Sequence, residues 1–378
     1  MHATAAAAPP ITPQASTLAR AAWLAYFFLI VYASWYPFSG WHDLGIGPLA
    51  YLNWTVPHYW TRFDVATNVV GYIPFGILTV YVLYPAIRGV WAFLMTLLIG
   101  ALVSGLMEAV QTFLPTRVPS NLDFITNFAG AVIGAGIGMA TIDKLLGRDR
   151  LRTLRQRWFL LDSSAALVLV TLWPLAQIYP QPYLFGHGQL VPIVSDWMSD
   201  LFESPVDIAA WLRQGVQLSV EQYWLSETVI TACGLSGALL ALLCLLRPLA
   251  PRARLVMCLI GAALLVKALA TALLFTPDNA FAWLTPGAQG GILLGVLMVS
   301  GLAFAPPMAQ RRLALATLLI SLLVVNIIPA NPYFVATLQS WVQGKFLNFN
   351  GAAQFLSLLW PFCAVLFLLR SERQPSGG

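Results

Sequence analysis

Two stretches of the chain carry the same four residues at the same spacing: DVATNVVG at 64–71 and DFITNFAG at 123–130. Both read D-x-x-T-N-x-x-G. Offsets of 0, 3, 4 and 7 residues fall on one face of an α-helix. Each stretch therefore predicts a stripe of carboxylate, hydroxyl, amide and glycine, which suits polar binding and close helix packing. The repeat reflects either a duplicated helical hairpin or convergence on one packing need.

A third polar face lies between the two motifs, in SGLMEAVQTFLPTRVPSNLD (104–123). Glu108 and Gln111 are three residues apart, so they share a helix face. A carboxylate inside a membrane helix is unfavourable unless it faces the bundle and has a partner. We expect that partner to be Arg117, in the following loop, or Arg62.

These faces together predict a polar cluster at one end of three helices. Its members are the acids, amides and guanidinium of Asp64, Asn68, Glu108, Gln111, Arg117, Asp123 and Asn127. Such groups suit a lipid headgroup or another small polar molecule, and an arginine can grip phosphate with two hydrogen bonds. The alternative is a structural network that locks the helices together.

Two of the acids, Glu108 and Asp123, also suit general acid–base catalysis. No histidine lies within the motifs, so no activated nucleophile is indicated and no catalytic residue is assigned. The four histidines fall in the N-terminal tail or in predicted outer loops: His2, His42, His58 and His187. A hard cation would find oxygen ligands among the three acids, but we predict neither a resident metal nor a cofactor.

The composition places these motifs in a membrane. Of the 378 residues, 59% are hydrophobic and 9% are charged, and the mean hydropathy is +0.75. A soluble domain usually carries about 25% charged residues, so this chain has too few polar groups to cover a soluble globule. We predict an all-α fold, a polytopic integral membrane helical bundle.

Ten segments are apolar over about the 20 residues that a membrane helix needs. They are approximately 21–39, 64–84, 90–113, 123–142, 159–179, 225–246, 255–275, 286–305, 313–330 and 353–370. The basic run at 143–158 should be cytoplasmic. Both termini are then cytoplasmic, and the polar cluster lies at the outer side. The net charge of +5 follows from this topology and does not indicate a nucleic-acid partner.

The expected organisation has two membrane domains. It comprises a disordered tail (1–20), a four-helix domain (21–146), a basic linker (147–158), a six-helix domain (159–370) with an outer loop at 180–224, and a tail (371–378). The first apolar run is interpreted as a retained helix, because bulky residues follow it where a signal peptide would be cleaved. The outer loop contains two short amphipathic helices, which would lie on the membrane or act as a lid.

A second candidate site lies in the six-helix domain. Lys267 is about eight residues below the outer end of its helix, and an intramembrane lysine suggests a functional site. We favour the alternative of a structural ion pair with Glu227, at the top of the preceding helix.

The segments EAVQTFLPTRVPSNLDFITNFAGAVIG (108–134) and NVVGYIPFG (68–76) resemble the VanZ-like family of bacterial membrane proteins. The resemblance covers roughly residues 21–146, and the six further helices are an extension. It implies a multi-pass protein of the bacterial cytoplasmic (inner) membrane that acts in the cell envelope. The family takes its name from a glycopeptide-resistance accessory protein associated with reduced susceptibility to teicoplanin.

The leading hypothesis is that the outward-facing cluster binds a lipid headgroup or a lipid-linked envelope precursor. Membrane lipids are then the expected partners. An enzyme that uses Glu108 and Asp123 on such a lipid is the first alternative. A transporter would need a polar path across the membrane, where only Lys267 lies at depth. A scaffold would tolerate neutralisation of the acids.

Overall fold

The computed structural model describes residues 17–36, 38–53, 60–143, 156–160, 164–216, 218–275, 277–330, 334–335 and 347–370. The chain forms two compact units, Met1–Leu154 and Arg155–Gly378. The predicted tails up to residue 16 and from 371, most of the predicted linker, and two of the histidines, His2 and His58, lie outside the described residues.

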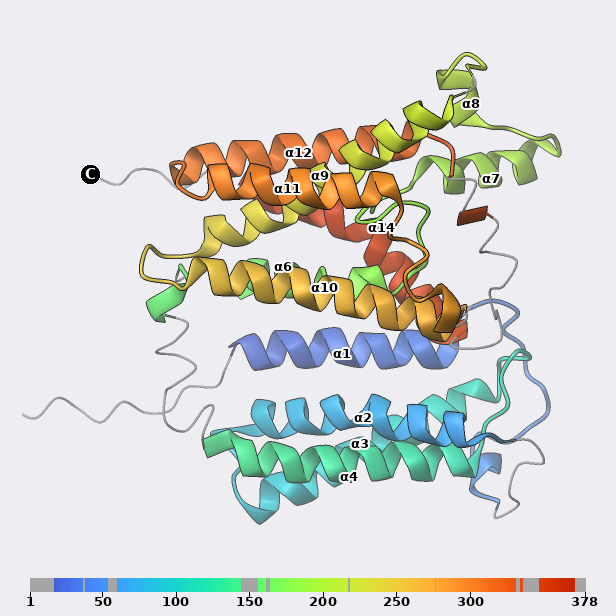
Figure 1. Cartoon of the computed structure of the whole chain (residues 1–378). Helices are drawn as coiled ribbons and strands as arrows, with labels where there is room; N and C mark the ends of the chain where they lie inside the picture. Colours follow the sequence, from blue (N-terminus) through green and yellow to red (C-terminus); the bar gives the residue numbers. More distant parts are fainter. Residues whose placement is uncertain are drawn as a thin grey trace, which may run out of the picture. The chain divides into compact units, whose positions relative to one another are not determined.

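The N-terminal unit contains the four predicted helices. They are α1 (Thr17–Trp35), α2 (Arg62–Leu83), α3 (Val90–Gln111) and α4 (Asn121–Ile142), with a short 3-10 turn, η1 (Ala50–Leu52), between the first two. All four are long and apolar enough to cross a membrane. They run alongside one another (Figure 1).

Helices α2 and α4 approach each other closely because α4 carries glycines one turn apart on the facing side. A Cβ atom added at Gly130 would lie 2.2 Å from the carbonyl oxygen of Val69. One added at Gly134 would lie 2.2 Å from the carbonyl oxygen of Ile73. Small residues let membrane helices pack backbone against backbone, so larger side chains at these positions would force the two helices apart.

The two motif glycines differ in this respect. A Cβ at Gly71 would meet nothing within 4 Å, and the carbonyl oxygen of Gly71 accepts a hydrogen bond from Tyr26 Oη at 2.7 Å. On α2 it is Gly76 that packs tightly, since a Cβ there would lie 2.4 Å from the Ala131 carbonyl oxygen. The expectation of close packing is confirmed for Gly130 and wrong for Gly71.

The C-terminal unit is also helical in its described residues, apart from an isolated bridge between Phe159 and Leu246. Its elements are α6 (Ser164–Leu172), η3 (Leu175–Gln177), α7 (Val191–Phe202), α8 (Ile208–Leu212), α9 (Val220–Leu245), α10 (Arg252–Leu274), η4 (Pro277–Asn279), α11 (Pro286–Leu302), α12 (Pro307–Ile327) and α14 (Leu347–Arg370). Helix α9 is the core of this unit, because 83% of its apolar window is buried. Helices α11 and α12 pack on it.

The polytopic helical bundle is confirmed, and the expected number of spans needs a correction. Eight helices in the described part of the chain are long and apolar enough to span a membrane. The predicted spans at 159–179 and 286–305 correspond to shorter apolar helices, Ala165–Gln177 and Pro286–Leu302. Proline explains both. Helix α6 ends just before Trp173–Pro174, and α11 begins at a proline and ends before the next pair of prolines, where a backbone N–H is missing.

The segment after η3 differs from the expected outer loop. Its residues Gln181, Tyr183, Leu184, Phe185 and His187 are buried. His187 thus lies in a non-helical segment, as predicted, but the segment is buried among helices. Irregular backbone is tolerated at membrane depth where protein surrounds it, and the glycines of this segment permit that. The predicted amphipathic helices are present as α7 and α8, and their action as a lid stays a prediction.

The buried segment is held by specific contacts. The imidazole Nε2 of His187 lies 2.6 Å from Gln177 Nε2, and Nδ1 lies 3.1 Å from Ser357 Oγ on α14. Gly188 has a φ of +81°, in the region that glycine adopts without strain, and its N–H donates to the carbonyl oxygen of Ser357 at 3.1 Å. These contacts tie the segment between η3 and α7 to α14.

Candidate functional site

The predicted polar cluster assembles where α1 and α3 end and α2 and α4 begin. Gln111 Nε2 donates to the carbonyl oxygen of Ser34 at 3.1 Å. The guanidinium of Arg117 donates to the carbonyl oxygen of Tyr36 through Nε at 3.1 Å and through Nη2. These two side chains join the end of α3 and the following loop to the end of α1. Burial lowers the pKa of Arg117 below its ordinary value.

Glu108 is the most deeply placed acid of the cluster, with 2% of its surface exposed. Its Oε2 accepts a hydrogen bond from the backbone N–H of Ser120 at 2.8 Å. Ser120 is the N-cap of α4, and its Oγ accepts from the N–H of Leu122 at 3.1 Å and of Asp123 at 3.4 Å. The carboxylate therefore lies at a helix N-terminus, where the macrodipole favours negative charge. This backbone N–H takes the place of the expected arginine partner.

The two motif asparagines join three helices. Asn68 Nδ2, on α2, donates to Asp123 Oδ1, on α4, at 2.8 Å. Asn127 Nδ2, on α4, donates to Ser104 Oγ, on α3, at 3.2 Å. Both Asn127 and Ser104 are buried. The predicted convergence of the two motif faces is thus present, although the equivalent asparagines have different partners.

Asp64 has a different environment from the other acids. It is exposed, and its Oδ2 accepts from the N–H of Thr61 at 3.0 Å and from Thr61 Oγ1 at 2.7 Å. Thr61 Oγ1 in turn accepts from the Asp64 N–H at 3.1 Å. This reciprocal arrangement is a capping box. Asp64 therefore lies at the rim of the cluster, and starting α2 accounts for its contacts.

The cluster is acidic and its acids are held by neutral donors. Glu108 accepts from a backbone N–H and Asp123 accepts from a side-chain amide. The pKa of the nearby Tyr51 phenol is raised, first by burial and then by the negative charge of Glu108. Among the described residues, no group of three His, Cys, Asp or Glu side chains is arranged to hold a metal ion.

Two members of the site were not among the sequence candidates. Ser120 and Ser104 supply the partners of Glu108 and Asn127. A signal existed for each. Ser120 precedes Asp123 by three residues, which is the spacing of a helix start, and Ser104 lies one turn before Glu108 on the same face of α3.

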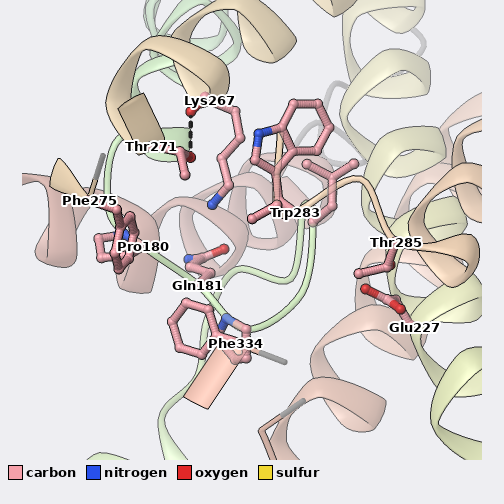
Figure 2. A pocket seen from close by; sticks show the side chains of 12 residues that line it. Pro180, Gln181, Glu227, Lys267, Thr271, Phe275, Trp283, Thr285 and Phe334 are labelled. Carbon is pink, nitrogen blue, oxygen red and sulfur yellow. Dashed lines mark hydrogen bonds between the residues drawn. The ribbon is translucent and has the colours of Figure 1, made fainter. Parts of the chain in front are cut away.

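The second candidate site does not contain the expected ion pair. Figure 2 shows the Lys267 ammonium pointing toward Gln181, while Glu227 lies beside Thr285 on the other side of the cavity. Glu227 Oε2 packs against the first turn of α11, because a Cβ at Gly287 would lie 2.4 Å from it. Glu227 therefore lies beside the start of α11 and apart from Lys267.

Comparison with known proteins agrees with the N-terminal unit. Residues 20–142 match the model of a protein family described as VanZ/LLP1. This unit therefore contains a segment similar to VanZ/LLP1 proteins, a VanZ-type domain. Together with the eight apolar helices of the described residues, the match indicates a multi-pass membrane protein. The match ends with α4, so helices α6 to α14 are an extension. No curated protein and no solved structure matches the chain.

Proposed function

We propose that the polar cluster of the VanZ-type domain binds the headgroup of a membrane lipid or of a lipid-linked precursor. The protein would do this at the outer side of the bacterial cytoplasmic membrane and act there in maintenance of the cell envelope. The observation that carries the proposal is the buried carboxylate of Glu108, held by a backbone N–H beside a second acid, Asp123, held by an amide.

A purely structural network has little need for this charge. Polar contacts between membrane helices average about 0.6 kcal/mol, and neutral side chains would supply them without burying acids. Ionised carboxylates accept strong hydrogen bonds from charged or hydroxyl donors. A headgroup amine or sugar hydroxyl is such a donor. Arg117, anchored at the same end, is the group suited to the phosphate of the same headgroup.

The family match suggests a process in which binding at the cluster would matter, namely glycopeptide tolerance. The VanZ-like family takes its name from an accessory protein associated with reduced susceptibility to teicoplanin, a glycopeptide that acts outside the cytoplasmic membrane. We infer that occupation of the cluster by an envelope lipid would underlie such tolerance. The match to residues 20–142 supports this, because those residues contain every member of the cluster.

Native mass spectrometry of protein extracted in mild detergent tests the proposal. The wild type is compared with Glu108→Gln and Asp123→Asn, which keep side-chain size and remove charge. Asp143→Asn is the matched control, because Asp143 is an exposed acid at the opposite end of α4. We expect one lipid class to copurify with the wild type and the control, and to be lost from the folded cluster variants.

Two results would reject the proposal. Folded Glu108→Gln and Asp123→Asn proteins that retain the same lipids would show that the acids do not select a headgroup. Unfolding of both variants, with the control intact, would assign the cluster to stability of the helix bundle.

A further inference from the structure

A buried ammonium group in the C-terminal unit points into a cavity (Figure 2). Lys267, on α10, is 4% exposed. Its backbone carbonyl oxygen accepts from Thr271 Oγ1 at 2.8 Å. Its Nζ atom donates no hydrogen bond to any residue that the structure describes. An ammonium inside a membrane segment is unfavourable without a partner, so a partner is expected in the cavity.

A second polar side chain shares this cavity. Gln181 belongs to the buried segment after η3, is 7% exposed, and points toward the Lys267 ammonium in Figure 2. Within the described residues its side-chain amide also makes no hydrogen bond. More than about 90% of buried polar groups in proteins have a hydrogen-bond partner. Two such groups from distant segments therefore face one space that can supply it.

The cavity has a volume of about 40 Å³. One water needs roughly 10–15 Å³ by this measure, so the space holds about three waters or the oxygens of one small anion. Its lining also includes the apolar side chains of Pro180, Phe275, Trp283 and Phe334, which lie around the lysine and the glutamine (Figure 2). The indole N–H of Trp283 already donates to the carbonyl oxygen of Ala280 at 2.8 Å, so the cavity's donors are at the lysine end.

We propose that this cavity binds a phosphate group, as free inorganic phosphate or as the phosphodiester of a lipid headgroup. Lys267 Nζ and Gln181 Nε2 are its donors. An ammonium offers three N–H groups and a glutamine amide two, and a phosphate has enough acceptor oxygens to satisfy them. Lysine binds phosphate as a point charge.

Glu227 also lines the cavity, and its carboxylate limits where an anion can bind. Glu227 lies against the first turn of α11, on the far side of the cavity from Gln181. Its negative charge repels a second anion. The cavity therefore takes a single phosphate group at the end formed by Lys267 and Gln181. This site is separate from the cluster of the VanZ-type domain and does not depend on it.

The test uses the full chain purified in a maltoside detergent that contains no phosphate. Native mass spectrometry detects a retained phospholipid, and isothermal titration of delipidated protein with sodium phosphate measures free phosphate. The variants are Lys267→Met, which removes the charge, and Gln181→Leu, which removes the amide. Arg254→Met is the matched control, because Arg254 is an exposed cation near the other end of α10.

We expect wild type and Arg254→Met to bind, and Lys267→Met to weaken binding about tenfold or more, as the loss of a charge-assisted hydrogen bond predicts. Gln181→Leu should weaken it by a smaller factor, and it tests the site independently if Lys267→Met fails to fold. A retained phospholipid identifies the headgroup as the source, and a phosphate titration without lipid identifies the free anion. No binding by the wild type, or equal binding by all folded variants, would overturn the proposal.

Discussion

The two motif glycines provide a sharp test of how the helices of the N-terminal unit pack. Gly130 and Gly71 occupy the same position in the two copies of D-x-x-T-N-x-x-G. An alanine Cβ at Gly130 would lie 2.2 Å from the Val69 carbonyl oxygen, whereas one at Gly71 would meet nothing within 4 Å. Carbon–oxygen contacts between helices are normally about 3.3 Å or longer. Gly130→Ala therefore forces α2 and α4 apart by about 1 Å.

Overpacking of this kind costs about 1–3 kcal/mol. Gly71→Ala should be neutral, or stabilising by up to about 1 kcal/mol, because alanine is the better helix former. Unfolding of both variants in the same detergent, followed by the tryptophan fluorescence, measures the two changes. Equal stability of the two variants would refute the reasoning, because it would mean that α2 and α4 do not touch at Gly130.

Three further predictions concern single contacts and use the same unfolding measurement. Asn127→Ala removes a buried hydrogen bond to α3 and should destabilise the protein by about 0.6 kcal/mol, and by at most about 1.7; no loss would mean that the bond is not formed. Gly287→Ala places a Cβ 2.9 Å from the backbone carbonyl oxygen of Trp224 and should cost about 1–3 kcal/mol. Gly261→Ala, with nothing within 4 Å, should not, and similar values for both would contradict this packing. Arg117→Met removes two hydrogen bonds to the end of α1 and should cost about 1–3 kcal/mol; an unchanged midpoint would show that α1 is held elsewhere.

Hydropathy and motif spacing predicted much of the N-terminal unit. The apolar runs located α1 to α4, and the helical offsets placed Asp123 and Asn68 on faces that do meet. The partner of Glu108 was harder to predict, because charge counting considers side chains and omits the backbone N–H groups at a helix start. Ser120 supplies such a group. Asp64 was assigned to the cluster by periodicity, although its position three residues after Thr61 also fits a capping box.

The C-terminal unit was predicted less well for a physical reason. Hydropathy measures how apolar a segment is, and it does not distinguish a loop in water from a polar segment buried among helices. Gln181 and His187 were therefore placed outside, whereas the structure buries both. For the same reason, the sequence suggested Glu227, the nearest acid, as the partner of Lys267. The start of α11, which Glu227 contacts, contributes no charged side chain and so gave no signal.

Photo-crosslinking in native membranes tests the central claim, headgroup binding by the acidic cluster, most directly. A photoreactive residue at Val118, which is 80% exposed in the loop between α3 and α4, reports the lipids at the mouth of the cluster. We predict that the wild type crosslinks one headgroup class above its share of the membrane, and that Glu108→Gln and Asp123→Asn abolish this enrichment while folding normally. Crosslinks in membrane proportions, the same in the wild type and both variants, would contradict the account.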